Sequence, residues 1–290
     1  MCIRSMTSKL CGVSDIRIVL QYPASTRRMA LTQTIQILLP EFQGFLVLIS
    51  RIGGLLAALP VLSGRTVPAK VKLALVLTLG VLLAPLVRLP VVPYDPVVLA
   101  AGLVSEMVIG LAIGLAVRLF FGALELAGEL IGVQMGFGVV QLFDPTTAEQ
   151  TPIIGQYFTL LATLLFLSLN GHLLLVATII SSYESIPAFG ASVPGEMGEA
   201  ILRLSQNMFI LGLKLAAPVL VIILLINILL ALLGRAVSQI NVFVLSFPVT
   251  IAGGLAVMSL SAPFVTELLV REIERLQFTI DELLRALGHG

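Results

Sequence analysis

The sequence predicts an all-α, multi-pass integral membrane protein, and three observations lead to this prediction. Of its 290 residues, 58% are hydrophobic and only 11% are charged, whereas soluble domains average roughly 45–50% and 25%. The apolar residues form six long runs, which charged residues, Pro and Gly separate. These runs lack the strict alternation of membrane β-strands, and a backbone in lipid must satisfy its hydrogen bonds internally, so we expect helices.

Charge and cysteine content exclude several other classes of protein. The 17 basic and 16 acidic residues give a net charge of +1, without the clustered Lys and Arg that nucleic-acid binding requires. The two cysteines, Cys2 and Cys11, both lie at the N-terminus and offer neither a disulfide framework nor a zinc site in the core. We therefore expect no nucleic-acid partner and no metal or other cofactor.

The first 28 residues differ from the rest of the chain. They carry five basic residues and one acid, and they lack the apolar stretch of a signal peptide. Met29 opens the sequence MALTQTIQILLP, which is typical of a protein start. We expect 1–28 to be an N-terminal extension from an over-long start assignment, and 29–290 to be the membrane domain. A basic anchor on an anionic membrane surface is the alternative.

The six apolar runs are expected to be helices at about 42–62, 71–87, 97–121, 153–181, 212–233 and 242–263. Crossing ~30 Å of hydrocarbon takes ~20 residues, so the second run is short. The fourth lies within an uncharged stretch of 34 residues, and Asn170-Gly171 in its middle is expected to bend it. Lys and Arg are spread too evenly over the loops to establish the orientation in the membrane.

A C-terminal amphipathic helix is expected at about 264–288. Its apolar residues recur at spacings of four and three, while Glu267 and Arg271 form an i,i+4 pair on the polar side. The apolar positions are Leu269, Ile273, Leu276, Ile280, Leu283 and Leu287. Such a helix either closes the fold on its surface or docks on a partner subunit or the membrane.

Ionisable residues inside apolar runs are costly in a membrane and are candidate functional positions. The sequence contains seven: Arg51, Glu106, Arg118, Glu125, Glu129, Lys214 and Arg235. Glu125 and Glu129 share one helix face, one turn apart, and could form a proton or cation site. Pairing with basic residues of neighbouring helices, or a position outside the bilayer, is the alternative.

Glycines recur at four-residue spacing in the same region. Gly128, Gly132 and Gly136 form one series, and Gly110 and Gly114 form a second. Because small residues let two helix backbones approach closely, we expect helix contacts at these glycines.

The segment that follows, 135–151, is rich in Gly, Met and Phe. Gly136 and Gly138 weaken the helix, and Asp144-Pro145 ends it or starts a turn. A flexible apolar loop of this kind can seal a pore as a hydrophobic constriction. An ordinary turn packed in the core is the alternative.

Signatures of enzymes are missing from the sequence, which has no HExxH motif, no P-loop and no GxSxG motif. His172 alone cannot form a metal site, and we expect no catalytic activity. A solute transporter is a competing interpretation, as is an intramembrane enzyme. The 122–152 pattern, however, does not recur in the second half of the chain, as the paired repeats of a transporter would require.

Four short blocks resemble the FliR family of flagellar type III export-gate subunits, whose injectisome counterpart is SctT. In order, they are Arg51 with 60–72, 128–136 with Asp144-Pro145, 169–172 with Pro187, and 233–248. The resemblance covers about 41–275. In the fourth block, Ser238 stands where the family usually has Pro, so the turn after Arg235 is expected to be less rigid.

The resemblance implies a non-enzymatic subunit of the bacterial type III export gate, located in the inner (cytoplasmic) membrane and the flagellar basal body. Its helices would form hairpins in a helical complex with FliP-like and FliQ-like subunits and an FlhB-like protein. Unfolded flagellar subunits would pass through the channel during flagellum assembly. Secretion of virulence effectors by an injectisome is the alternative, and the 239–248 block favours the flagellar role.

The resemblance also implies that the segment matching 135–151 is a plug that lines the closed channel. The implied plug and lumen residues are Met135, Gly136, Phe137, Gly138, Val140, Leu142, Phe143 and Asp144. Glu125, Glu129 and Arg118 would support the helix that carries this plug.

Overall fold

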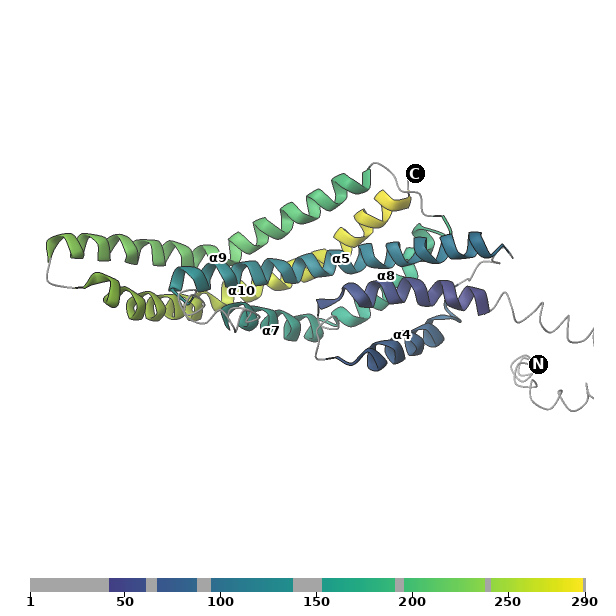
Figure 1. Cartoon of the computed structure of the whole chain (residues 1–290), viewed down its shortest axis with the longest axis horizontal. Helices are drawn as coiled ribbons and strands as arrows, with labels where there is room; N and C mark the ends of the chain where they lie inside the picture. The colour runs from purple at the N-terminus through teal and green to yellow at the C-terminus, as the bar shows by residue number, and fades with distance from the viewer. Residues whose placement is uncertain are drawn as a thin grey trace, which may run out of the picture.

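The computed structural model describes residues 42–60, 67–87, 95–137, 153–190, 196–237 and 241–288. In this part of the chain the regular elements are all α-helices, which lie side by side in an elongated bundle (Figure 1). The prediction of an all-helical, multi-pass membrane protein is confirmed. The expected N-terminal extension, 1–28, lies outside the described residues.

Two short helices open the described chain. The first, Phe42–Ala58, packs against α4 (Ala69–Leu83). α4 buries only Val76, Gly80 and Leu83. A side chain added at Gly80 would meet the rings and methylenes of the first helix at 3.1–3.2 Å. α4 is therefore held along one narrow face and exposes most of its apolar surface.

α5 (Pro96–Met135) is the central helix of the bundle and has 40 residues. The Asp95 carboxylate accepts a hydrogen bond from the Val97 N–H, and Pro96 takes the first helical position, an arrangement typical of helix starts. Gly136 ends the helix in a left-handed conformation with φ 92°. The apolar run expected to end near residue 121 therefore continues for about 21 Å more, at 1.5 Å per residue.

α7 (Ile153–Ser168) and α8 (Gly171–Ser185) are two helices at an angle of 67°. Between them, Asn170 adopts the left-handed conformation, with φ 57°. The phenyl ring of Phe166 occupies the space where a side chain at Gly171 would lie, 2.4 Å away. The bend predicted at Asn170-Gly171 is confirmed.

α9 (Glu196–Ala236) and α10 (Val242–Gly288) have 41 and 47 residues and form a long hairpin. The amphipathic segment expected at 264–288 is continuous with the apolar run before it. All six of its periodic apolar residues are buried against this chain's own core. Pro263, at the junction, costs one backbone hydrogen bond without ending the helix.

The tip of this hairpin projects beyond the end of α5 (Figure 1). By length and composition, three described helices could each cross a membrane: α5, α9 and α10. The bent pair α7 and α8 provides a fourth crossing if it counts as one span.

Candidate functional site

A buried ion pair joins the first helix to α5. Arg51 Nε donates to Glu106 Oε2 at 2.7 Å, and neither side chain is exposed to solvent. Both residues were functional candidates from sequence because they interrupt apolar runs. Fifty-five residues separate them in the chain, so no local pattern indicates that they are partners.

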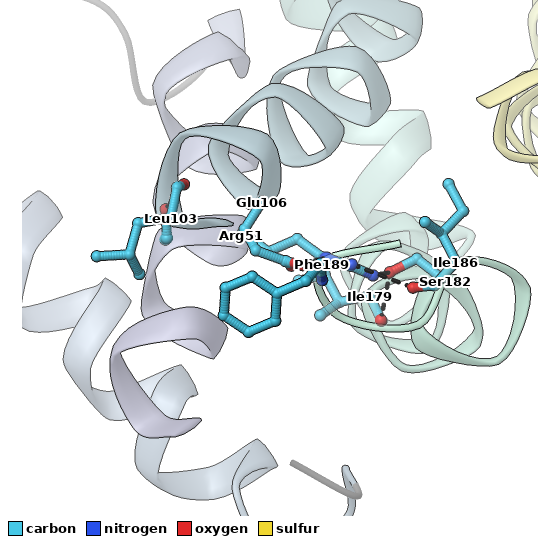
Figure 2. Close-up of polar contacts among 8 residues, drawn as sticks. Arg51, Leu103, Glu106, Ile179, Ser182, Ile186 and Phe189 are labelled. Carbon is cyan, nitrogen blue, oxygen red and sulfur yellow. Dashed lines mark hydrogen bonds and ion pairs between the residues drawn. The ribbon is translucent and has the colours of Figure 1, made fainter. Parts of the chain in front are cut away.

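The guanidinium of Arg51 also binds the end of α8 (Figure 2). Nη1 donates to the Ser182 hydroxyl at 2.8 Å, and Nη2 donates to the Ile186 carbonyl at 3.2 Å. The aromatic ring of Tyr183 stacks on the guanidinium, with 3.7 Å between Cζ and the ring centroid. The sequence gives no sign of these α8 partners, since Ser and Tyr in an apolar helix are not distinctive.

The Glu106 carboxylate holds the segment after α8. Its Oε1 accepts a hydrogen bond from the Phe189 N–H at 3.2 Å. Phe189 has a φ of 66°, which is strained for a bulky residue. Its ring fills the space beside Gly102 that a Cβ atom would occupy. The ion pair is thus the centre of a polar cluster, Arg51, Glu106, Ser182, Tyr183 and Phe189, that joins three parts of the chain.

Glycines allow the close helix crossing that brings Arg51 to Glu106. A Cβ atom on Gly110 would lie 2.0 Å from the Arg51 carbonyl oxygen, and one on Gly54 would lie 2.3 Å from that of Met107. Farther along, Gly114 faces Ala58. The two backbones therefore touch without intervening side chains.

The later glycines of α5 lie against another helix or in the core. A Cβ atom on Gly128 would lie 2.2 Å from Gly155 Cα in α7. Gly132 is buried within α5.

The end of α5, where the expected plug begins, is packed against α10. Met135 is fully buried, and its carbonyl accepts a hydrogen bond from the Thr250 hydroxyl at 3.2 Å. Phe137 is half-buried and packs on the core. The Met135 side chain therefore packs against α10 at Gly254, where the missing side chain of the glycine leaves room for it.

The other residues of the expected plug lie outside the described residues. They are Gly138, Val140, Leu142, Phe143 and Asp144. The described part of the segment is the last residue of α5 and the turn after it, Met135 to Phe137.

Three charged residues of α5 lie on a face that this chain leaves uncovered. Arg118, Glu125 and Glu129 are exposed. None of them takes part in the ion pairs found in the described part of the chain. Within the same residues, no group of three His, Cys, Asp or Glu side chains is arranged to hold a metal ion.

Three described helices that are long and apolar enough to cross a bilayer indicate a helical integral membrane protein. Its family is shown by comparison with known proteins, because the profile of the bacterial export proteins, family 1, matches residues 42–276. The chain belongs to this family. The resemblance to FliR drawn from the four sequence blocks is confirmed.

Three relatives illustrate the similarity, and each is a flagellar biosynthetic protein FliR. The Escherichia coli (strain K12) protein is 33% identical over 240 residues, 80% of this chain and 91% of the relative. The Pectobacterium carotovorum protein is 33% identical over 215 residues, 74% and 82% of the two chains. The Bacillus subtilis (strain 168) protein is 31% identical over 218 residues, 73% and 83%.

Proposed function

We propose that this protein is a non-enzymatic subunit of the bacterial type III export gate, which helps to form and seal the channel for unfolded flagellar subunits. Family membership and the FliR relatives make it a membrane-embedded component of flagellar protein export. The flagellar names of these relatives favour this role over secretion of effectors by an injectisome. We place the protein in the inner membrane, at the flagellar basal body.

The exposed charged residues on one face of α5 support the proposal that the chain works within a complex. Arg118, Glu125 and Glu129 are exposed, and a charged side chain such as Arg costs about 2.5–3.5 kcal/mol when it faces hydrocarbon at the centre of a helix. Neighbouring protein or an aqueous channel would remove that cost. FliP-like and FliQ-like subunits and an FlhB-like protein are the proposed neighbours, with membrane lipid around the apolar surface.

The proposed seal is the segment at about 135–151. The left-handed Gly136 turns the chain away from α5, and glycine gives such a segment wide backbone freedom. We propose that the apolar residues there block ions when the gate is idle and move aside when an extended chain enters.

Co-purification tests the assembly. The chain from Met29 would be expressed with the FliP-, FliQ- and FlhB-like proteins of its own organism, extracted in mild detergent and measured by native mass spectrometry. A single copy in a stable complex is the expected result. A monomer or homodimer in the presence of folded partners would refute the proposal.

A deletion of residues 137–142 tests the seal. Cells that contain the assembled gate with this deletion should leak ions when no substrate is present, whereas cells with the intact gate should not. An unchanged membrane conductance with a correctly assembled complex would refute the sealing role.

A further inference from the structure

We propose that Thr250 on α10 is a positioning residue that sets where the chain leaves α5, so that α10 controls the placement of Gly136 and Phe137. This inference rests on the proposed function, because residue 135 is where the proposed seal begins.

The hydroxyl of Thr250 connects the two helices. Thr250 is 4% exposed. Its Oγ1 lies 2.9 and 3.2 Å from the Ser246 and Phe247 carbonyls of its own helix, and 3.2 Å from the Met135 carbonyl. The last carbonyls of a helix have no partner within it. The N–H groups of Gly136 and Phe137 bond to the Val133 and Gly132 carbonyls, so neither of them serves the Met135 carbonyl. The single proton of the Thr250 hydroxyl lies within reach of that carbonyl and is shared with the Ser246 and Phe247 carbonyls of α10.

Two neighbours of Thr250 enclose the same point. Phe247 and Gly254 lie three residues before and four after Thr250, on the same face of α10. A Cβ atom on Gly136 would lie 2.8 Å from Phe247 Cδ1, and one on Gly254 would lie 2.8 Å from Met135 Cε. We call Phe247, Thr250 and Gly254 the α10 seat; they hold the end of α5 by one hydrogen bond and close packing.

The α10 seat lies at the base of the hairpin tip. Beyond it, Phe243 and Val244 are 70% and 63% exposed. Pro248, inside the seat, has no N–H and leaves one helical hydrogen bond unmade. Because the seat contacts the end of α5 directly, a shift of α10 at this point displaces Gly136 and Phe137.

Thiol labelling measures the placement of Phe137 directly. The reporter is Phe137→Cys in a chain with Cys2→Ser and Cys11→Ser, assembled with its partners, and the readout is the rate of reaction with a maleimide. Thr250→Val preserves shape and removes the hydroxyl. Losing one hydrogen bond shifts an opening equilibrium by about two- to tenfold, so labelling should become faster by that factor.

Thr266→Val is the matched control. Thr266 lies on the same helix, and its hydroxyl donates to the Ala262 carbonyl of that helix at 2.9 Å. This substitution makes the same chemical change without touching α5, and it should leave the labelling rate unchanged.

Gly254→Ala and Gly253→Ala form a second pair of variants. Both place a methyl group against an apolar side chain of a neighbouring helix. Gly254→Ala pushes Met135 of α5, whereas Gly253→Ala pushes Ile226 of α9 at 2.4 Å. Only Gly254→Ala should accelerate labelling at position 137.

The outcomes separate this inference from the proposed seal. The role of the seat is overturned if Thr250→Val and Gly254→Ala label at the same rates as their controls. It is also overturned if none of the variants is labelled. Faster labelling in both, together with no leak from the 137–142 deletion, supports the seat and refutes the seal. Native mass on each variant shows that the complex is intact.

Discussion

Arg51 and Glu106 form an ion pair at 2.7 Å in which both side chains are completely buried, and this pair ties the first helix, α5 and the end of α8 together. Two buried charges are costly to desolvate, and only their mutual attraction and further hydrogen bonds offset that cost. The cluster around them supplies such bonds from Ser182, Ile186 and Phe189.

Removal of one charge from the pair should destabilise the protein strongly. Arg51→Met leaves the Glu106 carboxylate buried without a compensating positive charge, at a cost of about 3–5 kcal/mol. Replacing both residues, Arg51→Met with Glu106→Leu, should recover much of that loss, because apolar residues of similar volume often replace a buried pair well. Thermal unfolding of the purified protein compares both variants with the original chain. A single variant as stable as the original chain would show that the pair has no structural role.

Loss of the Ser182 hydroxyl should have a smaller effect. Ser182→Ala removes one acceptor of the Arg51 guanidinium and should cost about 1–3 kcal/mol. Ser181→Ala is the control, since the Ser181 hydroxyl donates only within α8, to the Thr178 carbonyl at 3.2 Å. Unfolding temperatures of the two variants should differ clearly. Equal temperatures would indicate that water replaces the lost hydroxyl.

Adjacent glycines of the first helix should respond in opposite ways to the same substitution. Gly54→Ala places a methyl group 2.3 Å from the Met107 backbone carbonyl, which cannot move without separating the helices. It should prevent folding or reduce the yield of monodisperse protein severely. Gly53 has nothing within 4 Å of the corresponding position. Gly53→Ala should be neutral or stabilise the helix by about 0.5–1 kcal/mol.

Size-exclusion chromatography and thermal unfolding distinguish these two variants. A well-folded Gly54→Ala protein would mean that the first helix does not cross α5 as closely as described.

The uncovered charges of α5 should matter for assembly more than for folding. Arg118, Glu125 and Glu129 are exposed, so changing all three to Gln should alter the stability of the isolated chain by less than about 0.5 kcal/mol. The same change should reduce the fraction of gate complex that survives in detergent, because it removes the charges that neighbouring subunits would contact. Native mass spectrometry measures that fraction.

Glu274→Gln, on the exposed side of α10, is the control for charge loss elsewhere. An undiminished complex from the triple variant would show that these charges face solvent in the assembly.

Local features of the sequence predicted the fold class and several of its details. Apolar runs predicted the helices, and Asn170-Gly171 predicted the bend between α7 and α8. The spacing of apolar residues from Leu269 to Leu287 predicted the buried stripe of α10. Each of these depends on neighbours within one or two helical turns, which a sequence pattern records.

The residues at which α5 and α10 begin and end were harder to predict from the sequence. Their continuity depends on packing that supports the backbone where Gly or Pro interrupts an apolar run, as at Gly122 and Pro263. The location of Met135 likewise depends on α10, which lies more than a hundred residues away in the chain.

By itself, the sequence determined that this protein is helical, belongs in a membrane and resembles the FliR family, because composition, periodicity and short motifs suffice for these conclusions. Only the tertiary structure decided that Arg51 pairs with Glu106, and that Thr250 meets the end of α5. It also left Arg118, Glu125 and Glu129 on an open face. Ion pairs and helix contacts form between residues that packing brings together across long separations, and no local pattern encodes which partners will meet.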